Sequence, residues 1–91
     1  MLKFAFNQGY VCGIFSSHFY IEYRFENIRT IDPLEWENFV IKSFKESEYY
    51  SKILKVFTEE DEIADFEEGL KLGTYNGVAF QYNKMNKLNG C

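Results

Sequence analysis

The chain has 91 residues, of which 46% are hydrophobic and 20% are aromatic, and its formal net charge is −4. A chain of this length can bury a core without a metal or a disulfide, so we expect one domain over residues 1–91, and its aromatic content excludes an intrinsically disordered protein. A single proline and two cysteines likewise exclude a collagen-like protein and a disulfide-rich secreted scaffold.

Three β-strands are predicted in the first part of the chain. Apolar residues alternate with other residues in 2–6 and, most clearly, in 19–26, where charged side chains lie on the outer face. This period of two is typical of antiparallel strands with one face in solvent. The apolar segment 10–15 is a further strand candidate, with either a bulge or a close backbone approach at Gly13 and a turn signal, Asn-Gln-Gly, at 7–9 before it.

Two helices are predicted in the middle of the chain. Asp32 is a good cap for a helix that begins at Pro33, because aspartate accepts from the first backbone N–H groups and proline suits the first helical position. Apolar residues then recur at helical spacing. They are Leu34, Trp36, Phe39, Val40, Ile41 and Phe44. A second helical stretch covers 49–57, after a break near 46–48.

A third helix is predicted to begin at Thr58, because Thr58 and Asp61 have the spacing of a capping box. Either Gly69 or Gly73 is expected to end it, since glycine is the usual residue just after a helix.

The C-terminal part is predicted to contain a last strand at 78–82, after an Asn-Gly turn at 76–77, and a frayed tail at 84–91. The pattern as a whole predicts an α+β fold, in which an antiparallel sheet of three or four strands is packed on one face by two or three helices. The side chains expected to form the core are Phe19, Ile21, Tyr23, Phe25, Trp36, Val40, Phe44, Ile53, Phe57, Phe66 and Phe80.

The sequence has few residues that could carry chemistry. His18 is the only histidine, and although Cys12, Ser16 and Ser17 lie near it in the chain, no nucleophile motif surrounds them. The residues Cys12, His18 and Cys91 lack the spacing of a zinc site, and the acidic run lacks the glycine and the alternation of a calcium loop. We therefore predict no catalytic residue, no metal site and no cofactor.

The distribution of charge is the most informative feature of the sequence. Residues 58–70 hold seven acidic residues and no basic one, whereas residues 71–91 hold three lysines and no acid. Such a run is often only a solvated face, but it also suits a basic partner, because its field speeds association. The predicted partner-binding residues are Glu59, Glu60, Asp61, Glu62, Asp65, Glu67 and Glu68.

The predicted function is protein binding, by a small acidic inhibitor or adaptor that docks this helix on a basic, nucleic-acid-binding surface of a nucleic-acid-processing protein. The acidic net charge argues against direct nucleic-acid binding, because phosphates would be repelled. No segment has the features of a signal peptide or a membrane span, so we predict a cytoplasmic protein without membrane association. A homodimer, formed through an exposed sheet edge, stays open.

In composition the chain resembles the phage-borne inhibitors of bacterial defence, anti-CRISPR proteins among them. It is short, acidic and without catalytic motifs, and it is rich in residue types that AT-rich codons encode. The resemblance implies an inhibitor of a bacterial defence nuclease complex that acts in the host cell cytoplasm.

Two other functions stay open at this point. One is a small enzyme or ligand-binding domain with an aromatic pocket around His18, and the other is a toxin-immunity or phage structural protein. A concave pocket lined by His18, Cys12 and tyrosine would favour the enzyme or ligand-binding alternative, and a convex acidic ridge would favour the binder.

Overall fold

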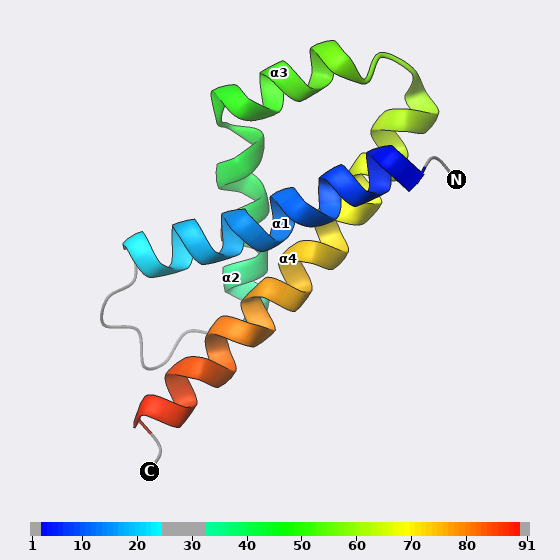
Figure 1. The fold of residues 1–91 in the computed structure, drawn as a ribbon. Helices are drawn as coiled ribbons and strands as arrows, with labels where there is room; N and C mark the ends of the chain where they lie inside the picture. The colour runs from blue at the N-terminus through cyan, green and yellow to red at the C-terminus, as the bar shows by residue number, and fades with distance from the viewer. Residues whose placement is uncertain (1–2, 25–32, 90–91) are drawn as a thin grey trace.

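The structure, a computed structural model, describes residues 3–24 and 33–89. Within these ranges it contains four helices and no strand (Figure 1). The helices are α1 (Lys3–Arg24), α2 (Pro33–Lys45), α3 (Glu48–Val56) and α4 (Glu60–Asn89). The predicted α+β fold with an antiparallel sheet is therefore wrong, and the chain forms a helical bundle-like fold. The helices α1 and α4 make the most extensive contact, α2 packs against both, and α3 contacts α2.

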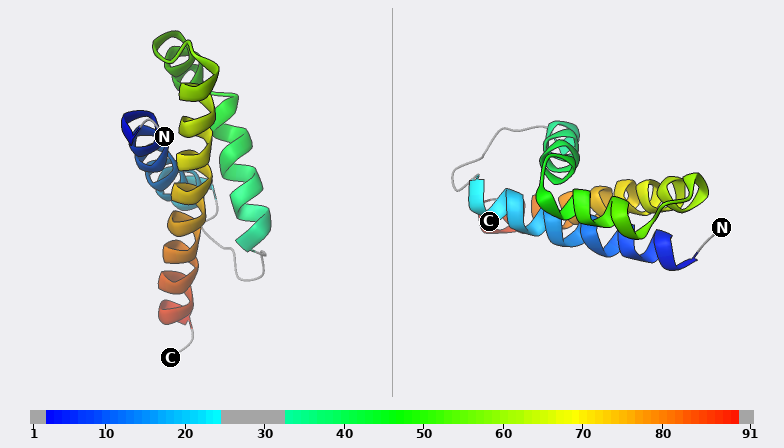
Figure 2. Two further views of the ribbon diagram at one scale, coloured as in Figure 1. Left: turned by 90° about the vertical axis from the view of Figure 1, so that its right-hand side faces the viewer. Right: turned by 90° about the horizontal axis from the view of Figure 1, so that it is seen from above.

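The pair of helices α1 and α4 is held together by close backbone contact (Figures 1 and 2). A Cβ atom at Gly13 would lie 2.5 Å from the backbone nitrogen of Thr74 and 2.6 Å from the carbonyl oxygen of Leu70, closer than a real side chain can come. Both helices place small residues at every fourth position along this contact. These residues are Gly9, Gly13 and Ser17 in α1, and Gly69, Gly73 and Gly77 in α4.

The two helices run parallel to each other. A Cβ at Gly9 would meet Leu70, one at Gly13 would meet Thr74, and one at Gly77 would meet Ser17, so the residue numbers rise in the same direction along both helices. Every fourth residue lies on one face of a helix, and small residues there let two backbones approach.

All four predicted strands are wrong. Helix α1 contains the segments 10–15 and 19–24 and the part of 2–6 from Lys3 onward. Helix α4 contains 78–82. Residues 25 and 26 lie outside the described residues. The turns and the bulge predicted at glycines are continuous helix as well. Each interior glycine costs a helix about 1 kcal/mol of intrinsic propensity, but here it allows an interhelical contact that outweighs this cost.

The predictions for α2 and α3 are confirmed. The helix α2 begins at Pro33, while its predicted cap, Asp32, lies outside the described residues. The break before α3 falls at residues 46–47, where the Ser47 hydroxyl accepts a hydrogen bond from the backbone N–H of Tyr50 at 3.4 Å. None of the residues of α3 is buried, so this helix contacts the core only through side chains that are partly buried.

The cap of α4 lies one residue after the predicted cap, Thr58. The backbone N–H of Glu59 donates to Oε1 of Glu62 at 3.3 Å, which is the reach-back bond of a capping box. The box therefore begins at Glu59, and Thr58 lies before it.

The end of α4 also differs from the prediction. The helix runs through Gly69 and Gly73 to Asn89, because both glycines face α1 within the helix and do not close it. It thus includes residues 84–89, which we predicted to be part of a frayed tail. Residues 90–91 lie outside the described residues.

The core consists of two clusters of buried side chains. The first contains Ala5, Cys12, Phe44, Phe57, Phe66 and Leu70. The second contains Ile21, Trp36, Val40 and Val78. In the first cluster the ring of Phe66 lies 6.1 Å from that of Phe44 and 5.8 Å from that of Phe57, centroid to centroid, and these rings join the end of α2 and the residue after α3 to α4.

Six of the predicted core residues are buried: Ile21, Trp36, Val40, Phe44, Phe57 and Phe66. The prediction is wrong for Phe19 and Phe80, which are exposed, because the strand period placed them inward and the helical period places them outward. Ile53 is half-buried, and Tyr23 and Phe25 lie outside the residues whose side chains are described.

Candidate functional site

The acidic residues predicted to bind a partner lie on the loop before α4 and on its first turns. Four of the seven are exposed: Glu59, Glu60, Asp61 and Glu68. The other three, Glu62, Asp65 and Glu67, are half-buried. Acidic residues at this end of a helix also stabilise it, because they complement the positive end of its dipole.

Among these carboxylates, Glu62 and Glu67 bind groups within the protein. Glu62 caps its own helix through the bond to the Glu59 N–H. Glu67 lies 3.1 Å from Nζ of Lys45 and accepts a hydrogen bond at 3.2 Å from the hydroxyl of Tyr50. Burial and the nearby Glu67 carboxylate raise the pKa of Tyr50, so this hydroxyl is protonated at neutral pH and can donate. Glu67 thus connects α2, α3 and α4.

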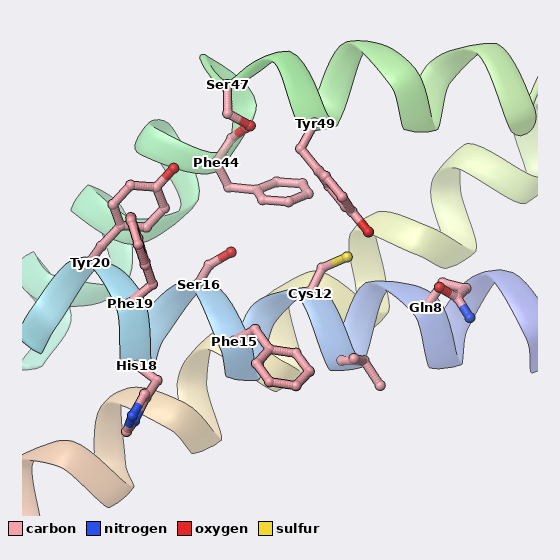
Figure 3. Close-up of a pocket in the computed structure, with 11 residues that line it drawn as sticks. Gln8, Cys12, Phe15, Ser16, His18, Phe19, Tyr20, Phe44, Ser47 and Tyr49 are labelled. Atoms are coloured by element: carbon pink, nitrogen blue, oxygen red, sulfur yellow. The ribbon is translucent and has the colours of Figure 1, made fainter.

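A groove of about 850 Å³ lies between α1 and the arm formed by α2 and α3 (Figure 3). One wall is a face of α1 and consists mainly of Gln8, Val11, Cys12, Phe15, Ser16 and Phe19. The other wall consists of Phe44, Ser47 and Tyr49. We call this depression the aromatic groove.

The aromatic groove is apolar and without charge. No Asp, Glu, Lys or Arg occurs among the described residues that line it. The side chains of Phe15 and Phe19 are 69% and 59% exposed, far more than a Phe in a packed core. Between Phe4 and Ile21 the sequence of α1 contains no Asp, Glu, Lys or Arg, so the face beside the groove carries none of these charged residues along its whole length.

His18 borders the groove, but its ring points away from the groove centre, toward α4 (Figure 3). The side-chain amide of Gln81 and Nδ1 of His18 are 2.6 Å apart, and since the amide nitrogen can only donate, Nδ1 accepts. The neighbouring Ser17 is fully buried, and its hydroxyl donates to the carbonyl oxygen of Gly13 at 2.8 Å. The Ser17 hydroxyl is thus bonded to the backbone of its own helix.

Cys12 lies in the groove wall and is almost fully buried. Burial raises the pKa of its thiol, because a thiolate is poorly solvated there. A thiol in this state is a weak nucleophile, so Cys12 contributes packing and not reactivity to the groove.

The groove was predicted only as an alternative, an aromatic pocket around His18, although a stronger signal for it exists in the sequence. Phe4, Gln8, Val11, Phe15 and Phe19 follow one another at intervals of three and four residues, which is the spacing of one helical face. The same helix carries its glycines on another face. The apolar row and the glycine row are apparent only when residues 3–24 are treated as a helix, and the strand interpretation concealed them.

Within the described residues, no group of three or more His, Cys, Asp or Glu side chains is arranged to hold a metal ion. None of the helices there combines the length and the apolar character needed to cross a membrane. Comparisons of the chain with protein-family models, with curated proteins and with solved structures find no match. The geometry of the protein itself therefore carries the functional argument.

Proposed function

We propose that this protein is an adaptor or inhibitor that binds an apolar helical segment of a polypeptide in the aromatic groove. The observation that carries the proposal is the uncharged groove wall, in which two phenylalanine rings are more than half exposed. Exposed aromatic rings that lie together mark interaction sites, because single isolated ones are common and contiguous ones are not.

The groove suits a helix better than a small molecule. From Phe4 to Phe19 the apolar face of α1 is about 22 Å long at 1.5 Å per residue, whereas a small ligand occupies a compact cavity. A partner helix with apolar residues at intervals of three and four would lie along this face. Covering Phe15 and Phe19 contributes about 1.5–3 kcal/mol for each ring that becomes fully buried.

The concave shape, with Cys12, His18 and tyrosine around it, also keeps the ligand-binding alternative open. The orientation of His18 and the protonated, buried Cys12 thiol argue against an enzyme that uses either residue. The volume is within the range of small-molecule sites, roughly 300–1,000 Å³, so a small apolar ligand is the competing occupant.

Binding of a synthetic amphipathic helix tests the proposed function. The probe is a fluorescent peptide of about 16 residues with a leucine stripe, and its anisotropy reports binding. We expect a dissociation constant in the micromolar range, and we expect Phe15→Glu to raise it at least tenfold, or about 1.4 kcal/mol, because a carboxylate would be desolvated in the groove.

The matched control for this experiment is Tyr75→Glu. Tyr75 is 58% exposed and aromatic, but it lies two residues from both Gly73 and Gly77 and hence on the opposite face of α4 from α1. This variant should bind the peptide like the parent. Equal affinities of the parent and Phe15→Glu proteins, or no binding to a parent that is monomeric at the concentration used, would refute the proposal.

A second candidate surface is the acidic run at the start of α4. Its exposed members are Glu59, Glu60 and Asp61 next to one another and Glu68 two turns further, and this exposure favours contact with a basic protein surface, including one that binds nucleic acid. The nearby Glu67, in contrast, already has Lys45 and Tyr50 as partners.

Reversing Glu59, Glu60 and Asp61 to lysine tests this surface without removing the Glu62 cap. If the acids attract a basic partner, a peptide with a lysine-rich polar face should bind the parent at least tenfold more tightly than a glutamate-rich one, and the triple variant should reverse this order. Higher salt should reduce the difference, because it screens exposed charges. Equal affinities for the two peptides at low salt would leave the acidic run as a solvated face.

A further inference from the structure

We propose that the helix that occupies the aromatic groove is α1 of a second copy of this chain, packed antiparallel in a two-fold symmetric dimer. This inference rests on the proposed function, because it names the occupant of the same groove. Three observations carry it: the symmetry of the stripe on α1, its lack of charge, and the area of its exposed rings.

The spacing of the stripe on α1 is the same in both directions, with a phenylalanine at each end. Phe4, Gln8 and Val11 precede a midpoint between residues 11 and 12, and Cys12, Phe15 and Phe19 follow it at the same intervals. A two-fold axis through this midpoint places Phe4 against Phe19 of the partner subunit and Gln8 against Phe15 of the partner subunit. Such self-complementarity is what a two-fold interface requires, since each patch must contact its own copy.

The charge of the protein favours a second copy over other occupants of this face. The chain carries a net charge of −4, but none of it lies between Phe4 and Ile21, so two copies can meet there without like charges opposing each other. The same segment has no Lys or Arg, whereas helices that lie on membranes place basic residues beside their apolar face. A lipid surface is therefore the less favoured occupant.

The exposed rings also supply a substantial part of the area that a dimer needs. Phe4 is 65% exposed, and with Phe15 and Phe19 it presents on the order of 400 Å² of ring surface, given about 150–250 Å² for each whole side chain. A standard interface buries about 800 Å² on each partner. The three rings supply about half of this, and Val11 and Tyr49, both around half exposed, extend the patch.

Sedimentation velocity over about 2–200 µM protein tests the dimer. We expect the parent to approach twice its mass of 10.8 kDa with rising concentration, and Phe15→Glu to raise the dimer dissociation constant at least tenfold. Tyr75→Glu should associate like the parent. Phe19→Glu is a second variant in case the first does not fold, as far-UV circular dichroism will reveal. A parent that stays monomeric over this range overturns the inference.

Disulfide trapping tests the antiparallel arrangement. In a background with Cys12→Ala and Cys91→Ser, the variants Gln8→Cys and Phe15→Cys are oxidised alone and as a mixture. We expect the mixed disulfide to form fastest, because the axis brings these positions together and keeps the two copies of position 8 about 10 Å apart along the helix, too far for a disulfide. Faster trapping of either variant with itself overturns the arrangement.

The outcomes separate this inference from the proposed function. A monomeric protein that still binds the leucine-stripe peptide through Phe15 refutes the second copy and retains the groove as a helix-binding site. A protein that neither associates nor binds the peptide refutes both. Flotation of the parent with phosphatidylcholine vesicles, lost in Phe15→Glu, would show that a lipid surface covers this face and would overturn the inference.

Discussion

Replacing Gly73 by alanine is expected to lower the free energy of unfolding by about 3 kcal/mol, at the upper end of what overpacking costs. A methyl group at this position would overlap the carbonyl oxygen of Tyr10 and would lie 2.8 Å from its carbonyl carbon. These are backbone atoms of α1, which cannot rotate away as a side chain can. The two helices would have to separate, and the contacts along their whole crossing would weaken. Chemical denaturation followed by far-UV circular dichroism measures the loss.

The direction of this effect distinguishes it from an effect of helix propensity. Intrinsic helix propensity alone predicts that Gly→Ala stabilises a helix by about 1 kcal/mol. Asn83→Ala, ten residues along the same helix at an exposed position, removes a poor helix former without a steric conflict and should be neutral or slightly stabilising. A Gly73→Ala protein that is more stable than the parent would mean that α1 and α4 do not pack through these glycines.

Replacing Trp36 by alanine should cost about 3–5 kcal/mol, as truncation of large buried aromatic residues does. Trp36 is 2% exposed and belongs to the cluster that joins Ile21 of α1 and Val78 of α4. Its ring also lies 6.3 Å from that of Tyr82. Removing it leaves a cavity among three helices, and since small domains are stable by only 5–15 kcal/mol, the variant should unfold at a much lower temperature.

Leu34→Ala is the control for this substitution, because Leu34 is an exposed apolar residue on the same helix. It should change the free energy of unfolding by no more than about 0.5–1 kcal/mol. At roughly 4–8 °C of melting temperature per kcal/mol for a domain of this size, calorimetry will separate the two variants clearly. Equal melting temperatures would mean that α2 does not face the core with Trp36.

The middle of the chain could be predicted from its sequence because its pattern is unambiguous. In α2 and α3 apolar residues recur at helical spacing with charged residues between them, and Pro33 and Ser47 mark the two starts. The helix at the acidic run was predicted for the same reason. Its carboxylates could be named as a candidate surface, but the sequence could not reveal that Lys45 of α2 and Tyr50 of α3 would meet Glu67.

Helix α1 and the second half of α4 could not be predicted in this way. In α1 apolar residues lie on every face, so alternation such as that of Phe19 and Ile21 fits a strand as well as a helix, and the glycines at 9 and 13 indicate turns when they are considered locally. Whether these residues form helix depends on a segment about 60 positions away with a matching row of glycines.

Composition, charge and local periodicity thus determined the two middle helices and the acidic start of α4. The tertiary structure alone decided that α1 and the second half of α4 are helical, that the small residues of the two helices face each other, and that Phe15 and Phe19 consequently point outward into the aromatic groove. The physical reason is that a glycine-lined contact stabilises neither helix by itself. It contributes only when two backbones meet, and that meeting is a property of the folded chain and not of any local segment.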